Sequence, residues 1–109
     1  MKNNNEGLQT TKNNTQLINE WKFILDNRIN QFEKCIIPLL KKDDIYTKKD
    51  VKEIIDAFSH AGLLINALSS MSLEKSISKE ERTFAKDYLS KVTDIVNEAY
   101  QEVLEEENE

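Results

Sequence analysis

This sequence is poor in the residues that make tight turns and covalent cross-links. Its 109 residues include two glycines, one proline and one cysteine. Because few glycines leave few positions for hairpin turns and left-handed backbone, the composition disfavours sandwiches and barrels of β-strands and favours helices. The single cysteine, Cys35, cannot form a disulfide within the chain, so we expect a cytoplasmic protein. The length suits one domain with its own hydrophobic core.

Long hydrophobic runs are also missing. The longest apolar stretch, residues 35–40, falls well short of the roughly 20 residues that cross a bilayer. Residues 1–16 are almost entirely polar and lack the apolar segment of a secretory signal peptide. We therefore expect no integral membrane segment.

Positive charge is in deficit, since the formal net charge is -5. This balance argues against nucleic acid as a partner, because binding to phosphates needs surplus lysine and arginine. The acid is concentrated in residues 94–109, which hold seven carboxylates and no basic side chain. This segment either neutralises the lysines that follow the first helix, forms an ordinary solvated surface, or docks a basic partner. The candidate acidic docking surface consists of Glu98, Glu102, Glu105 and Glu106.

The apolar residues that are present recur at helical spacing. From Asn14 onward they step by three or four residues, which is typical of one face of an amphipathic helix. Pro38 lacks a backbone donor, so we expect this helix to kink or end near it. Residues 1–13 are polar and predict a disordered tail. The face comprises Leu17, Trp21, Ile24, Leu25, Arg28, Phe32, Cys35, Ile36 and Leu39.

Two further helices follow, each with a start signal. Thr47 with Asp50 is typical of a helix N-cap, and Ser78 with Glu81 matches a capping box. The apolar arc of the helix from Thr47 is broad, so we expect that helix to be central, packed against both neighbours. Its seam comprises Val51, Ile54, Phe58, Ala61, Ile65 and Leu68, and a second stripe comprises Ala57, Leu64 and Met71. The seam of the helix from Ser78 comprises Ala85, Leu89, Val92, Val96, Ala99 and Val103.

The short connections between these helices decide how they pack. Connections of about five residues leave successive helices little choice but to run antiparallel. We predict an all-α fold, an up-down-up three-helix bundle with coiled-coil-like packing over residues 14–104. Residues 105–109 are expected to fray, because carboxylates are unfavourable at the negative end of a helix dipole.

Residue sets for catalysis or cofactor binding are missing. His60 is the only histidine, and with Asp56 alone it makes no set of nucleophile, base and orienting group. One histidine, one cysteine and no glycine-rich loop predict no metal, no cofactor and no enzyme. We expect Cys35 to pack as a small hydrophobic side chain and Trp21 to belong to the core.

Several residues do not fit the intramolecular seams. Phe23 and Leu63 point nearly opposite the core, and Ile37 would do so too if the first helix continued without a kink. Gly62 and Asn66 mark a patch of small residues where another helix could approach. These five residues are the candidate interface for a protein partner or a second copy, and we expect a homodimer.

The segment 77–89, with Ile77, Ser78, Glu81, Ala85 and Leu89, resembles a helix start found in bacteriocin immunity proteins, which are small cytoplasmic helical bundles. Further helices normally follow in that family, whereas here this helix is the last. The sequence thus predicts a small non-catalytic interaction or regulatory protein, of the kind that phages and plasmids encode. The resemblance implies an alternative, an immunity protein that acts at the cytoplasmic side of the membrane.

Overall fold

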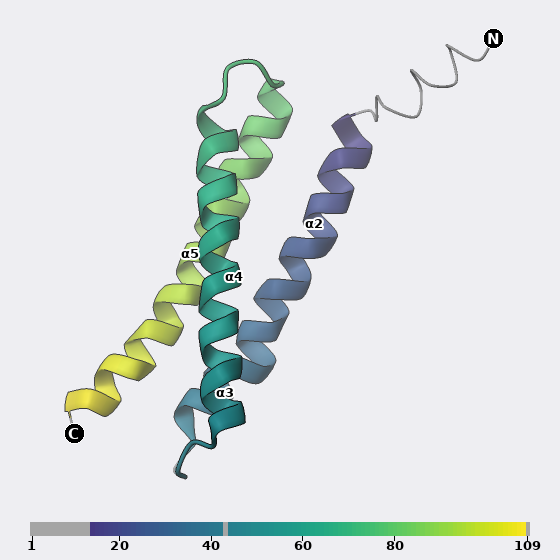
Figure 1. Ribbon diagram of the computed structural model, residues 1–109. Coiled ribbons are helices and arrows are strands. Elements are labelled where there is room, and N and C mark those ends of the chain that lie inside the picture. The colour runs from purple at the N-terminus through teal and green to yellow at the C-terminus, as the bar shows by residue number, and fades with distance from the viewer. Residues whose placement is uncertain (1–13, 43, 109) are drawn as a thin grey trace.

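The described chain is entirely helical apart from its connections. In this computed structural model the structure describes residues 14–42 and 44–108, and the expected tail at 1–13 lies outside them. The described residues contain no strand and form the predicted all-α, up-down-up bundle (Figure 1). Its elements are α2 (Asn14–Gln31), η1 (Phe32–Ile36), α3 (Ile37–Lys41), α4 (Lys48–Leu73) and α5 (Lys79–Asn108).

Both predicted helix starts are confirmed. The Thr47 hydroxyl accepts a hydrogen bond from the Asp50 N–H at 3.0 Å, and the Asp50 carboxylate accepts one from the Thr47 N–H at 3.0 Å. Ser78 and Glu81 make the same reciprocal pair, with both bonds at 3.1 Å. Each pair satisfies backbone donors that have no partner in the first turn of a helix. A bond from the Lys42 ammonium at 2.6 Å is the main cause that lowers the pKa of Asp50, followed by its bond from the Thr47 backbone.

A π-helical turn interrupts the first helix just before Pro38. The Ile37 N–H donates to the Phe32 carbonyl, five residues back, so η1 contains one more residue than an α-helical turn would. The extra residue rotates everything that follows, and Ile36 and Ile37 both become buried. The prediction that Ile37 is an exposed interface residue is therefore wrong, since its side chain is only 5% exposed. The same turn leaves Cys35 exposed, so its expected packing in the core is also wrong.

The central helix is α5 and not α4. α5 packs against α4 along the hairpin that they form and also contacts α2, η1 and α3. Helical spacing gives the width of an apolar arc but not the side on which neighbours lie, which is why the breadth of α4 misled the prediction. The buried side chains of α5 are Ala85, Tyr88, Val92, Ile95, Val96 and Ala99, whereas those of α4 are Ala57, Ala61, Leu68 and Ser72.

Contacts between aromatic rings join η1 to α4 and α4 to α5. The Phe32 and Phe58 rings meet edge to face with centroids 5.6 Å apart, and Phe58 lies against Tyr100 at 4.6 Å. Such pairs each contribute about 0.5–1.5 kcal/mol beyond the burial of their area. They lie in the half of the bundle nearer the connection between α3 and α4. From there α2 diverges from the α4–α5 hairpin towards its own N-terminus (Figure 1).

Two smaller expectations are also corrected. α5 continues to Asn108 instead of ending at residue 104, because each added residue of a formed helix gains a backbone hydrogen bond. That gain outweighs the few tenths of a kcal/mol by which like charges destabilise a helix. Ile24 was placed on the core face, yet it is exposed on α2, while Trp21 packs at the edge of the core as expected.

The assignment of the core can be tested by introducing an aspartate at one buried position and, separately, at one exposed position. Val92 is 1% exposed, so Val92→Asp buries an unpaired charge and is expected to cost about 3–5 kcal/mol, enough to abolish most of the helical circular dichroism. Ile24 is 51% exposed, and Ile24→Asp is expected to change the stability by no more than about 0.5 kcal/mol. Equal melting temperatures for the two variants would show that α5 does not hold the core.

Candidate functional site

The residues that carry chemistry do not gather into a reaction centre. His60 is exposed on α4, and Asp56, one turn before it, pairs instead with Lys52 at 3.3 Å. Over residues 14–42 and 44–108, no group of three or more His, Cys, Asp or Glu side chains is placed to hold a metal ion. The two residues considered for catalysis thus lie on an open helix surface.

The five predicted interface residues do not form one surface. Phe23 on α2 and Leu63 on α4 are exposed as expected, at 70% and 67%, but they lie on helices that diverge. Ile37 is buried in the core. Gly62 and Asn66 do lie together, one turn apart on α4, and a Cβ added at Gly62 would meet nothing within 4 Å. The structure therefore retains three of the five residues as neighbours, because Leu63 lies beside Gly62 and one turn before Asn66 on α4.

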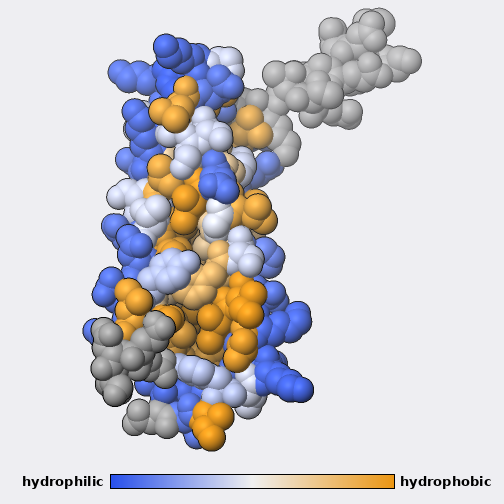
Figure 2. Space-filling view, turned by 60° about the vertical axis from the view of Figure 1, so that its left-hand side comes forward, coloured by the Kyte–Doolittle hydropathy of each residue, from blue (hydrophilic) through white to orange (hydrophobic). Residues whose placement is uncertain are grey.

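A different apolar surface runs along α4 and the adjoining part of α5. Leu73 is 77% exposed and Ile55 is 57% exposed, and several neighbours are half-buried. The stacking of Phe58 on Tyr100 joins the two helices into one face. Figure 2 shows apolar atoms along this face, gathered most densely in its lower half. We call this surface the outer stripe; it consists of Val51, Ile55, Phe58, Gly62, Ile65, Ser69 and Leu73 of α4 with Tyr100 and Leu104 of α5.

The signal for the outer stripe was present in the sequence. Its α4 residues step by 4, 3, 4, 3, 4 and 4, which is close to the spacing of a coiled-coil seam. Sequence reasoning assigned Val51, Phe58 and Ile65 to the intramolecular seam, because they also fit that pattern. Phe58 and Ile65 do pack against the core and are partly buried, so they lie at the boundary of the two surfaces, whereas Val51 is 44% exposed. The inner seam, which faces the bundle, comprises Ile54, Ala57, Ala61, Leu64 and Leu68.

The composition of α4 has a second consequence. By length and composition alone, Lys48–Leu73 is the one candidate for a membrane span among the described residues. Only 17% of its most apolar window is buried in the bundle. Length and composition do not separate a membrane span from a bundle helix with an uncovered apolar face. Both readings agree that α4 presents more apolar surface than its neighbours cover.

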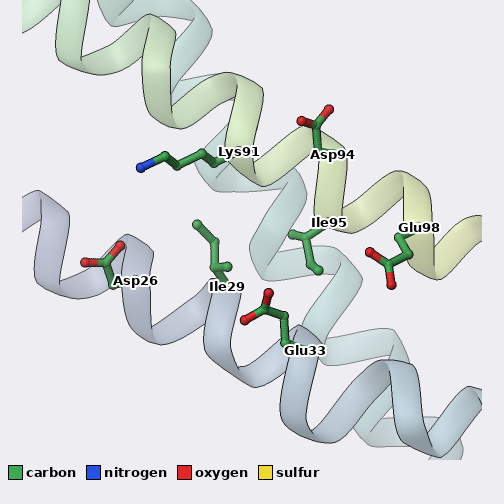
Figure 3. A pocket seen from close by; sticks show the side chains of 7 residues that line it. All are labelled: Asp26, Ile29, Glu33, Lys91, Asp94, Ile95 and Glu98. Atoms are coloured by element: carbon green, nitrogen blue, oxygen red, sulfur yellow. The ribbon is translucent and has the colours of Figure 1, made fainter.

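An acidic groove lies on the other side of α5, where α2 and η1 pack. It has a volume of about 460 Å³. Figure 3 shows Ile29 and Ile95 between four carboxylates and one lysine. The charged side chains that line the groove are Asp26, Glu33, Lys91, Asp94 and Glu98.

The predicted acidic docking surface is only partly assembled in this groove. Of its four residues, Glu98 lines the groove, whereas Glu102 pairs with Lys41 at 3.9 Å. This pair confirms the expected approach of the acidic segment to the lysines that follow the first helix. It contributes about 0–1 kcal/mol, because the lysine is solvent-exposed. Glu105 is exposed, and Glu106 lies outside the residues whose side chains are described.

Tyr88 connects the two walls of the groove. Its hydroxyl donates to the Asp26 carboxylate at 2.9 Å, and Lys91 lies over its ring at 4.5 Å. Burial of the ring, and then the hydrogen bond and the negative charge of Asp26, raise the pKa of Tyr88 to about 12. The neutral phenol is thus a structural tie between α5 and α2. It offers no base or nucleophile at neutral pH.

Comparison with protein-family models, with curated proteins and with solved structures finds no match to this chain.

The tie between Tyr88 and Asp26 predicts a loss of stability at high pH. Because the pKa of Tyr88 is raised from 10.0 to about 12, the stability that its neutral form provides is complete below pH 10 and is lost as the pH rises towards 12. In Tyr88→Phe this part of the loss should vanish. At neutral pH the variant should be about 1 kcal/mol less stable, because the hydrogen bond is gone.

Urea unfolding measured from pH 9 to pH 12 checks this expectation. Asp26→Asn serves as the companion variant, since it keeps the ring buried but removes the negative charge. Tyrosinate should then form at lower pH, as followed by ultraviolet absorbance. Parallel stability curves for the wild type and Tyr88→Phe would show that the phenol is not buried against Asp26.

Proposed function

We propose that this protein is a small, non-catalytic interaction protein that binds a protein partner through the outer stripe. The observation that carries the proposal is the exposure of Val51, Ile55 and Leu73 on one helix, beside Tyr100 and Leu104 on the next. Single exposed apolar side chains are ordinary, but contiguous apolar patches on monomeric proteins commonly mark interaction sites. The stripe runs the length of α4, and Gly62 and Ser69 interrupt its apolar residues.

The chemistry of the stripe suits a helical partner. Full burial of a large aliphatic side chain contributes about 1.5–3 kcal/mol, so a few such residues supply most of a micromolar affinity. Tyr100 presents a flat apolar ring with a polar tip, a side chain enriched at interfaces. The near-heptad spacing matches the way an amphipathic helix places anchors in a groove. α4 and α5 would act as a rigid platform, because their inner faces are already packed.

The non-catalytic part of the proposal rests on the residues that face solvent. Asp56 and His60 lie on an open helix surface, and the acidic groove contains only carboxylates and one lysine as polar groups. Carboxylates and a lysine can bind and orient cations or basic side chains. In the described residues they are not joined to a nucleophile and a base at hydrogen-bonding distance, which covalent catalysis needs.

A second candidate function follows from the resemblance of segment 77–89 to immunity proteins. The observation in its favour is that Ser78 and Glu81 form the capping box that this pattern needs, at the start of α5. Expression in a toxin-sensitive strain followed by challenge with the toxin separates the two candidates. Survival of the expressing cells would favour the immunity function. Death of these cells would leave the interaction protein as the remaining candidate.

Affinity capture from a lysate of the source cells tests the proposed function. Ile55→Lys places an ammonium group in the centre of the stripe, and we expect it to reduce partner capture at least tenfold, since desolvating an unpaired charge costs several kcal/mol. Phe23→Lys is the matched control, because it makes the same kind of change at an exposed position of α2. Undiminished capture by Ile55→Lys would place the binding surface elsewhere.

A further inference from the structure

We propose that the occupant of the outer stripe is a second copy of this chain, bound antiparallel so that the two α4 helices cross at Gly62. This inference rests on the proposed function and names its partner. It differs from the homodimer expected from the sequence, because it uses neither Phe23 nor Ile37. A two-fold axis through Gly62 generates the whole contact from one surface.

Two pairs of stripe residues lie symmetrically about Gly62. Val51 and Leu73 lie at equal distances along α4 on either side of it, and so do Ile55 and Ser69. In an antiparallel pair, Val51 of one copy therefore meets Leu73 of the other, and Ile55 meets Ser69. Each end of the dimer would bury one highly exposed leucine against the apolar half of the stripe. Figure 2 shows that the apolar atoms are densest at one end, which an antiparallel partner would cover with its opposite end.

Gly62 gives the crossing point. Glycine inside a helix costs about 1 kcal/mol relative to alanine, and nothing in the described residues requires its small size, because a Cβ there would meet open space. A glycine on the axis allows the backbones of two helices to approach closely, as a side chain would not. The open space at Gly62 is thus explained by a neighbour from outside the chain.

The available area is that of a stable dimer. With 26 residues, α4 is about 39 Å long, and the face that it shares with α5 is about 20 Å, or two helix diameters, wide. Such a face presents on the order of 800 Å² per copy, the area that each partner buries in a standard protein interface. Neither helix alone would present enough.

Charge at the ends of α4 favours the antiparallel direction. The N-terminal end carries the exposed Lys48 and Lys49, whereas the C-terminal end has no basic residue in its last turn and is followed by the exposed Glu74 and Lys75, whose charges offset each other. An antiparallel pair places each lysine end beside the negative end of the other helix dipole. A parallel pair would place lysines beside lysines.

Sedimentation equilibrium of the full chain tests whether a second copy occupies the outer stripe. We expect a dimer at micromolar concentration for the wild type and for Phe23→Lys. Gly62→Glu should be monomeric, with dissociation raised at least a hundredfold and helicity retained, because the space at this position is open within one copy. Ile55→Lys should behave in the same way. A helical Gly62→Glu that still dimerises as the wild type does would overturn the proposal.

Disulfide cross-linking tests whether the two α4 helices of the dimer run antiparallel. In a Cys35→Ser background, Gly62→Cys should form a covalent dimer on oxidation, because it lies on the axis. Val51→Cys alone should not, since its two sulfurs would be separated by about 33 Å along the helices, far beyond disulfide reach. An equal mixture of Val51→Cys and Leu73→Cys should give the cross-linked heterodimer. Cross-linking of Val51→Cys with itself would overturn the antiparallel arrangement.

The outcomes separate this inference from the proposed function. A wild type that stays monomeric at every concentration overturns the second copy as the occupant. The proposed function then stands if capture of a foreign protein is still lost in Ile55→Lys, and fails if that capture is unchanged. A dimer that dissociates in Phe23→Lys but not in Gly62→Glu overturns the second copy on the outer stripe, and the capture experiment still decides the proposed function.

Discussion

The packing of α5 between its neighbours is the constraint on which the rest of the structure depends. One side of α5 buries small residues against α4, which brings the two helices close along their length. Its other side receives α2, η1 and α3. Small residues such as Ala85 and Ala99 make the close approach possible, while Tyr88 and Val92 fill the wider spaces. Because α5 takes the central place, α4 packs along its length against α5 and meets η1 only in its N-terminal half.

The uncovered edge of α4 and the π-helical turn are both related to the central position of α5. The turn at Phe32–Ile36 brings Ile37 round to the side that Phe32 already buries, whereas an uninterrupted helix would place the two about 140° apart. That segment closes one end of the bundle. Within residues 14–42 and 44–108, no such segment covers the side of α4 that carries Ile55, and its apolar residues remain in solvent. The proposed function accordingly rests on this surface of α4.

Much of the fold could be predicted from the sequence because its signals are local. The starts at Thr47 and Ser78 follow from side chains that bond to backbone within one turn, and helical periodicity gave the number of helices. The π-turn could not be predicted, since it arises from the joint burial of Ile36 and Ile37 against other helices. A shift of one residue then moved Cys35 to the surface and Ile37 to the core.

The interaction surface was less accessible to sequence reasoning. Two seams on one helix share boundary residues, and Phe58 and Ile65 fit either of them. The choice between the seams depends on which side α5 occupies, and tertiary packing decides that side. Sequence reasoning did find Gly62, because it marks a patch of small residues where another helix could approach. It could not connect Gly62 with Tyr100, which comes from another helix.

The hydrogen bond between Tyr88 and Asp26 spans 62 residues of chain, and this separation bears on the order of folding. α4 and α5 are joined by a short connection, so their pairing closes a small loop at little entropic cost. Docking of α2 closes a loop several times longer. We expect the α4–α5 hairpin to form first and α2 to arrive late, held at its diverging end by few contacts. The chain would then expose both edges of α4 for a time, and assembly could begin before folding is complete.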